Sequence, residues 1–277
     1  DYAVTGVQTC ALPISGAFFE WGAEEWRKAL LLDDPEFERL RRLLARAGQI
    51  GIEIEQLRSQ GIYITTRAED DYPRRLKRTL KKSSPPLLYY CGDLRIADDS
   101  AVAVVGSRSP DERALEFTAK LAARCVGDGI HVISGGAKGI DSAAQEGALC
   151  SGGHVVSFLS DSLAKRIKYR DVRDSIMDGR LLMLSLAHPR AGFTVHAAMG
   201  RNKYIYGLSD FAVIVSSDEG KGGTWAGAVE ALKNGWVPVF VRDDEQAPGG
   251  NRRLLTMGAR PMTWEILNHE SKSLMEL

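Results

Sequence analysis

The sequence has no excess of either charge. Lys and Arg together number 36 and so do Asp and Glu, which gives a formal net charge of +0. Bulk charge therefore gives no indication of nucleic-acid binding, and any such site must come from local clustering of cations. Long apolar runs are also lacking: no stretch of about 18 apolar residues exists, so the sequence predicts no membrane span and no membrane partner.

Cysteine is scarce, and none of its spacings suits a metal site or a disulfide framework. The four cysteines lie far apart and form no CxxC pair: Cys10, Cys91, Cys125 and Cys150. Such spacings are typical of buried or free thiols in a reducing compartment, so we expect a cytoplasmic protein. None of the five histidines stands in an HExxH pattern either, and the sequence predicts no metal site.

The motifs of several common enzyme classes are absent. The chain has no GxxxxGKS or GxxxxGKT loop, which argues against a P-loop triphosphatase. No GxGxxG follows the first strand of the main domain, which disfavours a dinucleotide dehydrogenase, and no GxSxG nucleophile elbow is present. We therefore predict no catalytic residue and no cofactor.

What the chain does contain, from Ser100 onward, is an alternation of apolar runs and helical patterns. The runs are rich in Val, Ile and Leu: Ala101–Val105, Ile130–Ser134, His154–Leu159, Leu181–Ser185, Phe211–Ser216 and Val237–Val241. Helical patterns separate most of them: Asp111–Val126, Gly139–Leu149, Leu163–Met177 and Thr224–Asn234. Buried strands that alternate with helices predict a doubly wound, mostly parallel, Rossmann-like α/β sheet.

Five parts are expected along the chain. Residues 1–15 resemble the translated read-through of a sequencing adaptor and are expected to be a non-native leader. Residues 16–60 carry apolar stripes at helical spacing and are predicted to form a small helical N-terminal cap, in which Asp33-Asp34-Pro35 starts the second helix. Residues 61–99 form an extended lead-in segment, residues 100–270 the Rossmann-like domain, and residues 271–277 a C-terminal tail.

The lead-in segment contains a basic run. Residues 67–82 hold seven Lys and Arg against three acids. Such a run is typical of the solvated side of a helix, and a phosphate-contacting face is the alternative.

Three glycine-rich turns follow predicted strands. In an open α/β sheet, ligands bind beyond the carboxyl ends of the strands, where such turns lead into helix N-termini. Glycine permits close approach of the backbone, and its N–H groups can form an anion-binding concavity. Because each turn carries a cation (Arg108, Lys138 or Lys221), we expect a phosphate site there. The candidate residues are Gly106, Ser107 and Arg108; Ser134, Gly135, Gly136, Lys138 and Gly139; and Gly222, Gly223 and Thr224.

A further candidate segment runs from Met199 to Tyr204 and is expected to open a short helix. Its consecutive residues Arg201, Asn202 and Lys203 can contact phosphates, and Tyr204 can stack on a base. The alternative is a helical turn whose charges face water. Residues 161–203 carry nine Lys and Arg against four acids, whereas residues 204–246 carry three against seven, which favours contact with phosphate.

Five sequence stretches occur in a recognisable order: GIYITTRAEDDYPRRLKRTLKKSSPPLLYYCGDL, AVAVVGSR, SGGAKGIDSAAQEGAL, GRNKYIYGLSD and NRRLLTMGARPM. Through them the chain, from about Gly61 to about Leu267, resembles the DNA-processing protein A (DprA/Smf) family. The resemblance implies binding of single-stranded DNA, which members hand to the RecA recombinase during natural transformation. It also implies a homodimer and no established catalytic step. The pocket that takes the strand would use these residues: Gly106, Ser107, Arg108, Ser134, Gly135, Lys138, Gly139, Arg201, Asn202 and Lys203.

One departure from the family pattern keeps a second function open. The turn Gly222-Gly223-Thr224-Trp225 resembles that of the lysine-decarboxylase-like LOG phosphoribohydrolases, whose related folds bind nucleotide monophosphates. Those enzymes place glutamates directly after this turn, where Ala226 and Gly227 stand here, and Glu230 follows one helical turn later. The alternative to a DNA-binding protein is therefore a nucleotide-binding sensor or a LOG-like hydrolase.

Overall fold

The structure is a computed structural model that describes residues 21–269 and 272–277. The predicted non-native leader, residues 1–15, lies outside the described residues. Two compact units divide the chain, one ending at Leu57 and the other running from Arg58 to Leu277. Within the described ranges, no helix is both long and apolar enough to cross a membrane.

The first unit is helical, with α2 (Ala23–Leu30), α3 (Asp34–Leu44) and α4 (Ala47–Arg58). The predicted start of α3 is confirmed: the Asp33 side chain accepts a hydrogen bond from the Glu36 N–H at 2.8 Å. The Glu36 carboxylate in turn accepts one from the Asp33 N–H at 3.2 Å, which completes a capping box. The third helix begins at Ala47 and ends at Arg58.

The second unit is built on one nine-stranded sheet with the order β1-β2-β6-β5-β4-β3-β7-β8-β9. Its strands are β1 (Tyr63–Thr66), β2 (Leu87–Cys91), β3 (Ala101–Val105), β4 (His131–Ser134), β5 (Val155–Leu159), β6 (Leu181–Ser185), β7 (Phe211–Ile214), β8 (Val239–Arg242) and β9 (Arg260–Met262). The strands β3 to β9 pair in parallel, whereas β1 and β2 are antiparallel additions at one edge. The predicted doubly wound, mostly parallel sheet is therefore confirmed. The lead-in segment contributes two strands to it.

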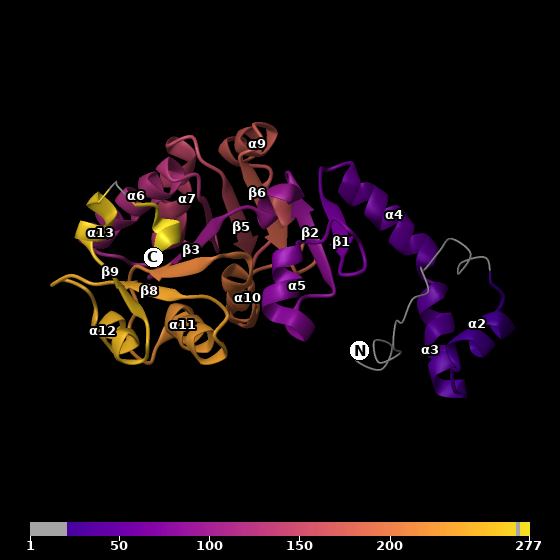
Figure 1. Ribbon diagram of the computed structural model, residues 1–277. Coiled ribbons are helices and arrows are strands. Elements are labelled where there is room, and N and C mark those ends of the chain that lie inside the picture. The colour runs from indigo at the N-terminus through magenta and orange to yellow at the C-terminus, as the bar shows by residue number, and fades with distance from the viewer. Residues whose placement is uncertain (1–20, 270–271) are drawn as a thin grey trace. The chain divides into compact units, whose positions relative to one another are not determined.

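Helices cover both faces of the sheet (Figure 1). One face carries α6 (Glu112–Gly127), α7 (Ile140–Cys150) and α9 (Arg170–Met177). The other carries α5 (Arg74–Leu80), α10 (Val195–Leu208), α11 (Gly222–Asn234) and α12 (Gly249–Thr256). The one-turn helix α8 (Leu163–Arg166) contacts β6. The short α13 (Trp264–Asn268) packs on α6. Because crossovers between parallel strands are right-handed, the change of face means that the winding direction reverses between β3 and β7.

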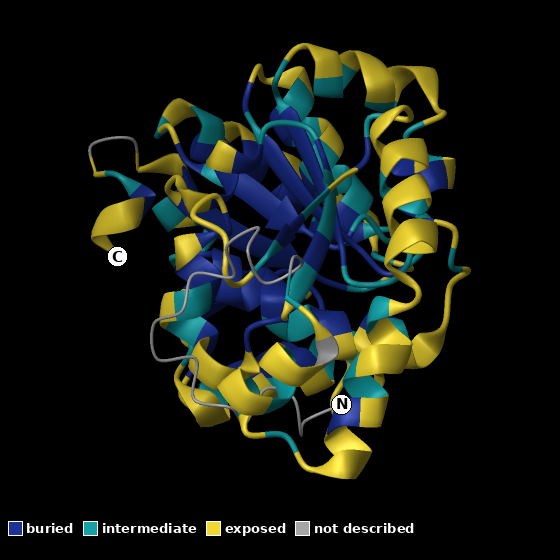
Figure 2. Ribbon diagram, turned by 90° about the vertical axis from the view of Figure 1, so that its right-hand side faces the viewer, coloured by how far each residue is buried: buried dark blue, intermediate teal, exposed yellow. Residues whose placement is uncertain are grey.

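The core lies between the sheet and its helices. Every residue of β3, β5, β6, β7 and β8 is buried, and Figure 2 shows the strands in dark blue beneath exposed outer helices. Burial on both faces explains why these strands are continuous apolar runs in the sequence. Tyr204 of α10 belongs to this core, where its ring stacks on Phe158 with centroids 5.4 Å apart.

Two predicted helices differ from those observed. The pattern over Leu163–Met177 forms two helices, because Tyr169 takes an extended conformation (ψ 137°) between them. The helix expected to open at Met199 begins at Val195 instead, since the Thr194 hydroxyl caps it by accepting a hydrogen bond from the Ala197 N–H at 3.1 Å. The segment Arg201–Lys203 therefore lies inside a helix and not at its start.

Arg75 connects α5 to the sheet through an ion pair and hydrogen bonds. Its side chain is 9% exposed and forms an ion pair with Asp210, and it also donates hydrogen bonds to the carbonyl oxygens of Asp98 and Asp99. The second oxygen of Asp210 accepts a hydrogen bond from the Ala101 N–H at 3.0 Å. One arginine therefore joins the lead-in segment to the first strand of the parallel sheet.

We predict that Arg75→Ala lowers the free energy of unfolding by about 2–4 kcal/mol, because it leaves a part-buried carboxylate and two carbonyl groups unpaired. The neighbouring Arg74 has an exposed side chain, so Arg74→Ala is expected to change stability by less than about 0.5 kcal/mol. Urea denaturation of both variants measures the difference. Equal destabilisation would contradict this role for Arg75.

Candidate functional site

A cavity of about 440 Å³ opens at the carboxyl ends of β3 and β7. These two strands are neighbours in the sheet, and their connections lead in opposite directions. The cavity therefore occupies the topological switch point, where doubly wound folds bind their ligands. Its walls come from the turn after β3, the turn after β7, the first half of α10 and the start of α11.

The structure brings together eight of the predicted site residues in the lining of this cavity. They are Gly106, Ser107, Arg108, Arg201, Asn202, Gly222, Gly223 and Thr224, and Lys221 joins them. Six others are not in the lining: Ser134, Gly135, Gly136, Lys138, Gly139 and Lys203. All three glycine-rich turns thus reach the cavity, but the turn after β4 contributes only Ala137 to the lining, and Asp141 follows it in the first turn of α7.

Helical geometry explains why Lys203 is separated from Arg201. Successive residues of a helix point about 100° apart, so three in a row cannot face one cavity. Arg201 is buried beside Asp141, while Asn202 turns toward α11 and donates a hydrogen bond to the Gly223 carbonyl at 2.9 Å. The Lys203 ammonium lies over the Tyr204 ring, 4.9 Å from its centroid. Tyr204 itself is only 7% exposed, so the base stacking that the sequence suggested for it is not available.

Beneath the cavity, the glycine turns surround the carboxylate of Asp141. The Gly135 N–H donates a hydrogen bond to Asp141 Oδ2 at 3.1 Å, and the backbones of Ala137 and Gly106 donate to the same carboxyl group. From the sequence, these amides were expected to bind an external phosphate. Instead, a carboxylate of the chain itself accepts from them, because the first turn of α7 places Asp141 inside the concavity.

Arg201 faces that carboxylate from α10. Burial raises the pKa of Asp141 above its ordinary value, although Arg201 and the backbone N–H groups act to lower it. Burial likewise lowers the pKa of the Arg201 guanidinium, while Asp141 raises it and nearby Arg108 lowers it further. Arg108 and Arg201 thus lie close enough to repel each other, as expected for two cations on one cavity.

The Arg201 side chain is buried, but its hydrogen-bonding capacity is largely unused. The residue is only 5% exposed, and its Nε and Nη1 atoms have no hydrogen-bond partner. The absence of a side chain at Gly135 makes room for the guanidinium, since a Cβ there would stand 1.6 Å from Arg201 Nη1. Gly135, which was predicted to approach a phosphate, therefore leaves space for the Arg201 side chain instead.

The rim of the cavity combines charge with apolar surface. Arg108 is exposed, and its guanidinium carbon lies 5.3 Å from the centroid of the Phe193 ring. Phe193, Val195 and Met199 line the same cavity and are 48%, 65% and 48% exposed. This arrangement offers a ligand both cationic donors and an aromatic surface.

Side-chain hydrogen bonds hold the two walls together. Thr224 donates from its hydroxyl to the Gly106 carbonyl at 3.0 Å, which links the start of α11 to the end of β3. Behind the second wall, the buried Asn251 accepts from the Ser217 N–H at 3.0 Å and donates to the Val215 carbonyl at 3.1 Å. Asn251 therefore holds in place the part of the cavity wall that contains Ser217.

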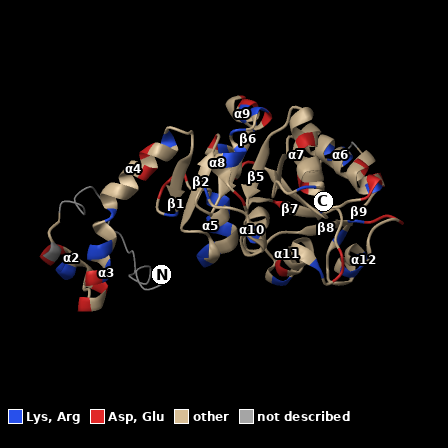
Figure 3. Ribbon diagram, turned by 180° about the vertical axis from the view of Figure 1, so that it is seen from behind, with Lys and Arg blue, Asp and Glu red and all other residues tan. Residues whose placement is uncertain are grey.

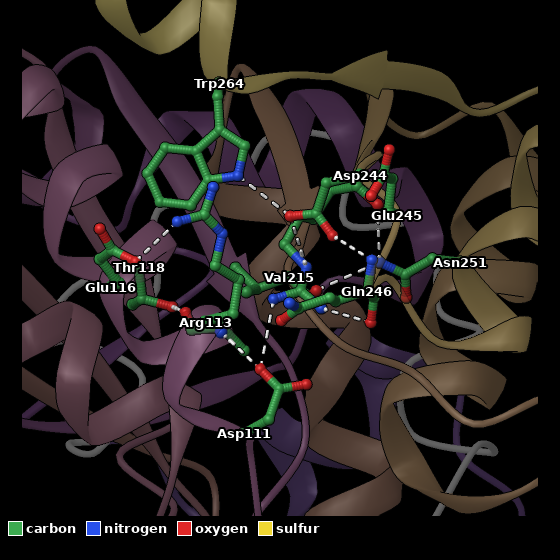
Figure 4. A network of polar contacts seen from close by, with 12 residues as sticks. Asp111, Arg113, Glu116, Thr118, Val215, Asp244, Glu245, Gln246, Asn251 and Trp264 are labelled. Atoms are coloured by element: carbon green, nitrogen blue, oxygen red, sulfur yellow. Dashed lines mark hydrogen bonds and ion pairs between the residues drawn. The ribbon is translucent and has the colours of Figure 1, made fainter.

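Asn251 belongs to a larger polar network at the end of β8 (Figure 4). It also donates to the carbonyl of Arg242, a fully buried residue whose side chain lies 3.5 Å from Asp111 and 3.7 Å from Asp244. Asp244 in turn accepts a hydrogen bond from Trp264 Nε1 at 3.0 Å. This network supports the carboxyl ends of the strands, and none of its residues lines the cavity.

Sequence reasoning missed two residues that shape the site. Asp141 was visible as an acid placed directly after a glycine turn and inside a first helical turn, which is a signal for an internal cap. Phe193 had no comparable signal, because its position over Arg108 depends on the path of the loop before α10. Among the described residues, no group of three or more His, Cys, Asp and Glu could hold a metal ion.

We predict that Asp141→Ala lowers the free energy of unfolding by about 3–5 kcal/mol, because it strips a buried arginine of its counter-charge and leaves backbone N–H groups unpaired. The exposed Asp70 provides the control, and Asp70→Ala is expected to stay within about 0.5 kcal/mol of the parent. Denaturant titration followed by circular dichroism measures both. A stability loss at Asp141 no larger than that at Asp70 would show that the buried carboxylate is dispensable.

Comparison with known proteins identifies chains that are related in sequence. Smf of Synechocystis sp. is 31% identical over 114 residues, which cover 40% of this chain and 28% of that protein. DNA processing protein DprA of Streptococcus pneumoniae is 28% identical over 201 residues, which cover 70% of this chain and 69% of that protein. The match thus spans less than a third of the Smf relative and about two thirds of the DprA relative.

Two solved structures share the architecture. DprA from Streptococcus pneumoniae superimposes with a TM-score of 0.72 at 22% identity, covering 91% of this chain and 87% of that one, a likeness that concerns the fold. DNA processing protein A from Helicobacter pylori, a structure described for its single-stranded DNA binding mode, gives a TM-score of 0.61 at 28% identity. That match covers 74% of this chain and 93% of the other.

The match to a protein family is longer than the match to Smf. Residues 63–269 correspond to the family described as DNA recombination-mediator protein A, and this range contains the whole nine-stranded sheet and every residue that lines the cavity. The chain therefore belongs to the DNA recombination-mediator protein A family, the family of the DprA and Smf proteins.

Proposed function

We propose that this protein binds single-stranded DNA through the cavity between β3 and β7. The observation that carries the proposal is the state of Arg201: a guanidinium that is almost wholly buried, lines the cavity and has two nitrogen atoms without partners. An unpaired buried donor costs free energy comparable to a lost hydrogen bond. A ligand that brings acceptor oxygens into the cavity removes that cost, and phosphate and base carbonyl oxygens are such acceptors.

The rim favours a nucleotide over a simple anion. Arg108 supplies an exposed cation, and Phe193 beside it supplies an aromatic face. Proteins that bind single strands combine cations for the backbone with aromatic rings on which bases stack. The Helicobacter pylori relative, described for its single-stranded DNA binding mode, supports the same choice of ligand.

The cavity gives less support to the alternative, a LOG-like hydrolase. Glu230, the acid that the alternative invokes, is exposed on α11 and is not part of the cavity lining. The carboxylates among the described lining residues are Asp141 and Asp218. Asp141 already accepts from three backbone groups, which leaves it poorly placed to act as a general base.

The proposal extends to the biological setting. We infer a role in DNA uptake and natural transformation, in which a homodimer holds the strand and passes it to a RecA-type recombinase. This part rests on membership of the recombination-mediator family. Light scattering of the free protein and recombinase filament assembly on a protein-coated strand test the two steps separately.

We predict that a fluorescent oligo-dT binds at low salt and that its affinity falls steeply as salt rises, because phosphate contacts release counterions. Arg108→Ala is expected to weaken binding by about tenfold, the loss of one charge-assisted contact of roughly 1.4 kcal/mol. Arg201→Met is expected to weaken it by more, since it removes the buried donors. Fluorescence anisotropy at several salt concentrations gives both values.

Arg173→Ala serves as the control, because Arg173 is an exposed arginine of α9 on the opposite face of the sheet. Thermal melting of each variant shows that it is folded. Affinities of Arg108→Ala and Arg201→Met that equal that of the control would remove the cavity from the proposal.

A further inference from the structure

The basic run predicted in the lead-in segment forms a surface that the cavity does not use. No acidic residue occurs between Asp71 and Asp93, a stretch that contains six Lys and Arg. One of the six, Arg75, is buried and paired with Asp210, and the others remain at least partly exposed. We use the name α5 basic face for five cations in and beside α5 that are at least partly exposed: Arg67, Lys77, Arg78, Lys81 and Lys82.

The acids nearest to this face in the sequence are occupied elsewhere. Glu69 accepts a hydrogen bond from the Thr66 N–H at 2.9 Å, and Asp71 accepts one from the Thr65 hydroxyl at 2.6 Å. Asp70, between them, is exposed. Figure 3 shows Lys and Arg in blue on α5 and no red on that helix. The face therefore presents net positive charge to solvent.

The α5 basic face is connected to the site through α10. Gly207 of α10 lies against α5, since a Cβ there would stand 2.8 Å from Leu80 Cδ1 and 3.2 Å from Leu76 Cδ2. Lys203 precedes Gly207 by four residues and so shares its side of the helix. Arg201 and Asn202, on the other sides of α10, line the cavity. A single helix thus has the cavity along one side and α5 along another.

A lysine of α10 and a lysine of α5 each lie over a tyrosine ring. The Lys203 ammonium lies 4.9 Å from the Tyr204 ring centroid, and the Lys77 ammonium lies 5.2 Å from the Tyr72 ring centroid. Tyr72 and Tyr204 belong to the same buried cluster. Burial raises the pKa of Tyr72, Arg67 lowers it and Tyr204 raises it, which places all three groups near one another. Lys203 of α10 and Lys77 of α5 therefore each contact a tyrosine of the same buried cluster.

We propose that a strand of DNA leaving the cavity passes Lys203 and continues over the α5 basic face, which contacts its phosphates. The proposal rests on the proposed function and extends its footprint beyond one pocket. Arg201 and Gly207 are about 9 Å apart along the helix axis, a distance that a few nucleotides span. The contact is with the backbone of the strand, so it carries no base preference.

The test compares oligonucleotides of two lengths on two variants. One variant removes three cations of the face, Arg67→Gln, Lys77→Gln and Arg78→Gln together. The matched control, Lys120→Gln, Lys168→Gln and Arg173→Gln together, removes three exposed cations that belong to α6, the α8–α9 connection and α9. The probes are oligo-dT of about 4 and about 20 nucleotides, near and beyond the limits of a small single-strand site.

We expect the α5 variant to bind the short probe as the parent does and to bind the long probe about tenfold more weakly. Its salt slope with the long probe should fall by about 2, since each phosphate contact on a single strand contributes about 0.7. The control variant should match the parent with both probes. Equal weakening with both lengths, or no difference from the control, would overturn the extended path. Failure of the parent to bind either probe would instead overturn the proposed function.

Discussion

The burial of Asp141 and Arg201 near each other, where each charge stabilises the other, is the constraint on which the site depends. The carboxylate fills the concavity made by the turns after β3 and β4 and holds their backbone N–H groups. Its charge compensates the burial of an arginine from a helix on the other face of the sheet. Two turns and one helix thereby surround two opposite charges, and both residues line the cavity. Burial of a charge costs free energy unless other groups compensate it, and the backbone N–H groups do so for Asp141.

This arrangement separates two tasks that glycine-rich turns often combine. Here the amides of Gly106 and Gly135 serve an internal carboxylate, so cationic side chains remain to meet an external phosphate. Arg108 is exposed on the rim, and Arg201, also a lining residue, has two buried nitrogen atoms without hydrogen-bond partners. Lys203 and the α5 basic face lie on the path that we propose for the strand beyond the cavity. In a protein with no net charge, binding of a polyanion relies on such local placement of cations.

Most of the architecture could be predicted from the sequence, because strands buried on both faces leave continuous apolar runs such as Ala101–Val105. The meeting of the turns after β3 and β7 could also be predicted, since parallel strands share one carboxyl edge. The position of Arg201–Lys203 within a helix could not. α10 begins at Val195, four residues before Met199, so the three residues lie inside the helix and point in different directions. The contact between Arg201 and Gly135 could not be predicted either, because it joins residues from two segments that are distant in the sequence.

The central claim is that the Arg201 guanidinium, held by Asp141, is the group that receives the ligand. Nuclear magnetic resonance of the arginine Nε–Hε groups during titration with oligo-dT tests it most directly, with Arg201→Met identifying the signal. The account predicts that the Arg201 resonance shifts downfield in proportion to bound strand, as its unpartnered N–H gains an acceptor. A complex that forms with the Arg201 resonance unmoved would contradict the account.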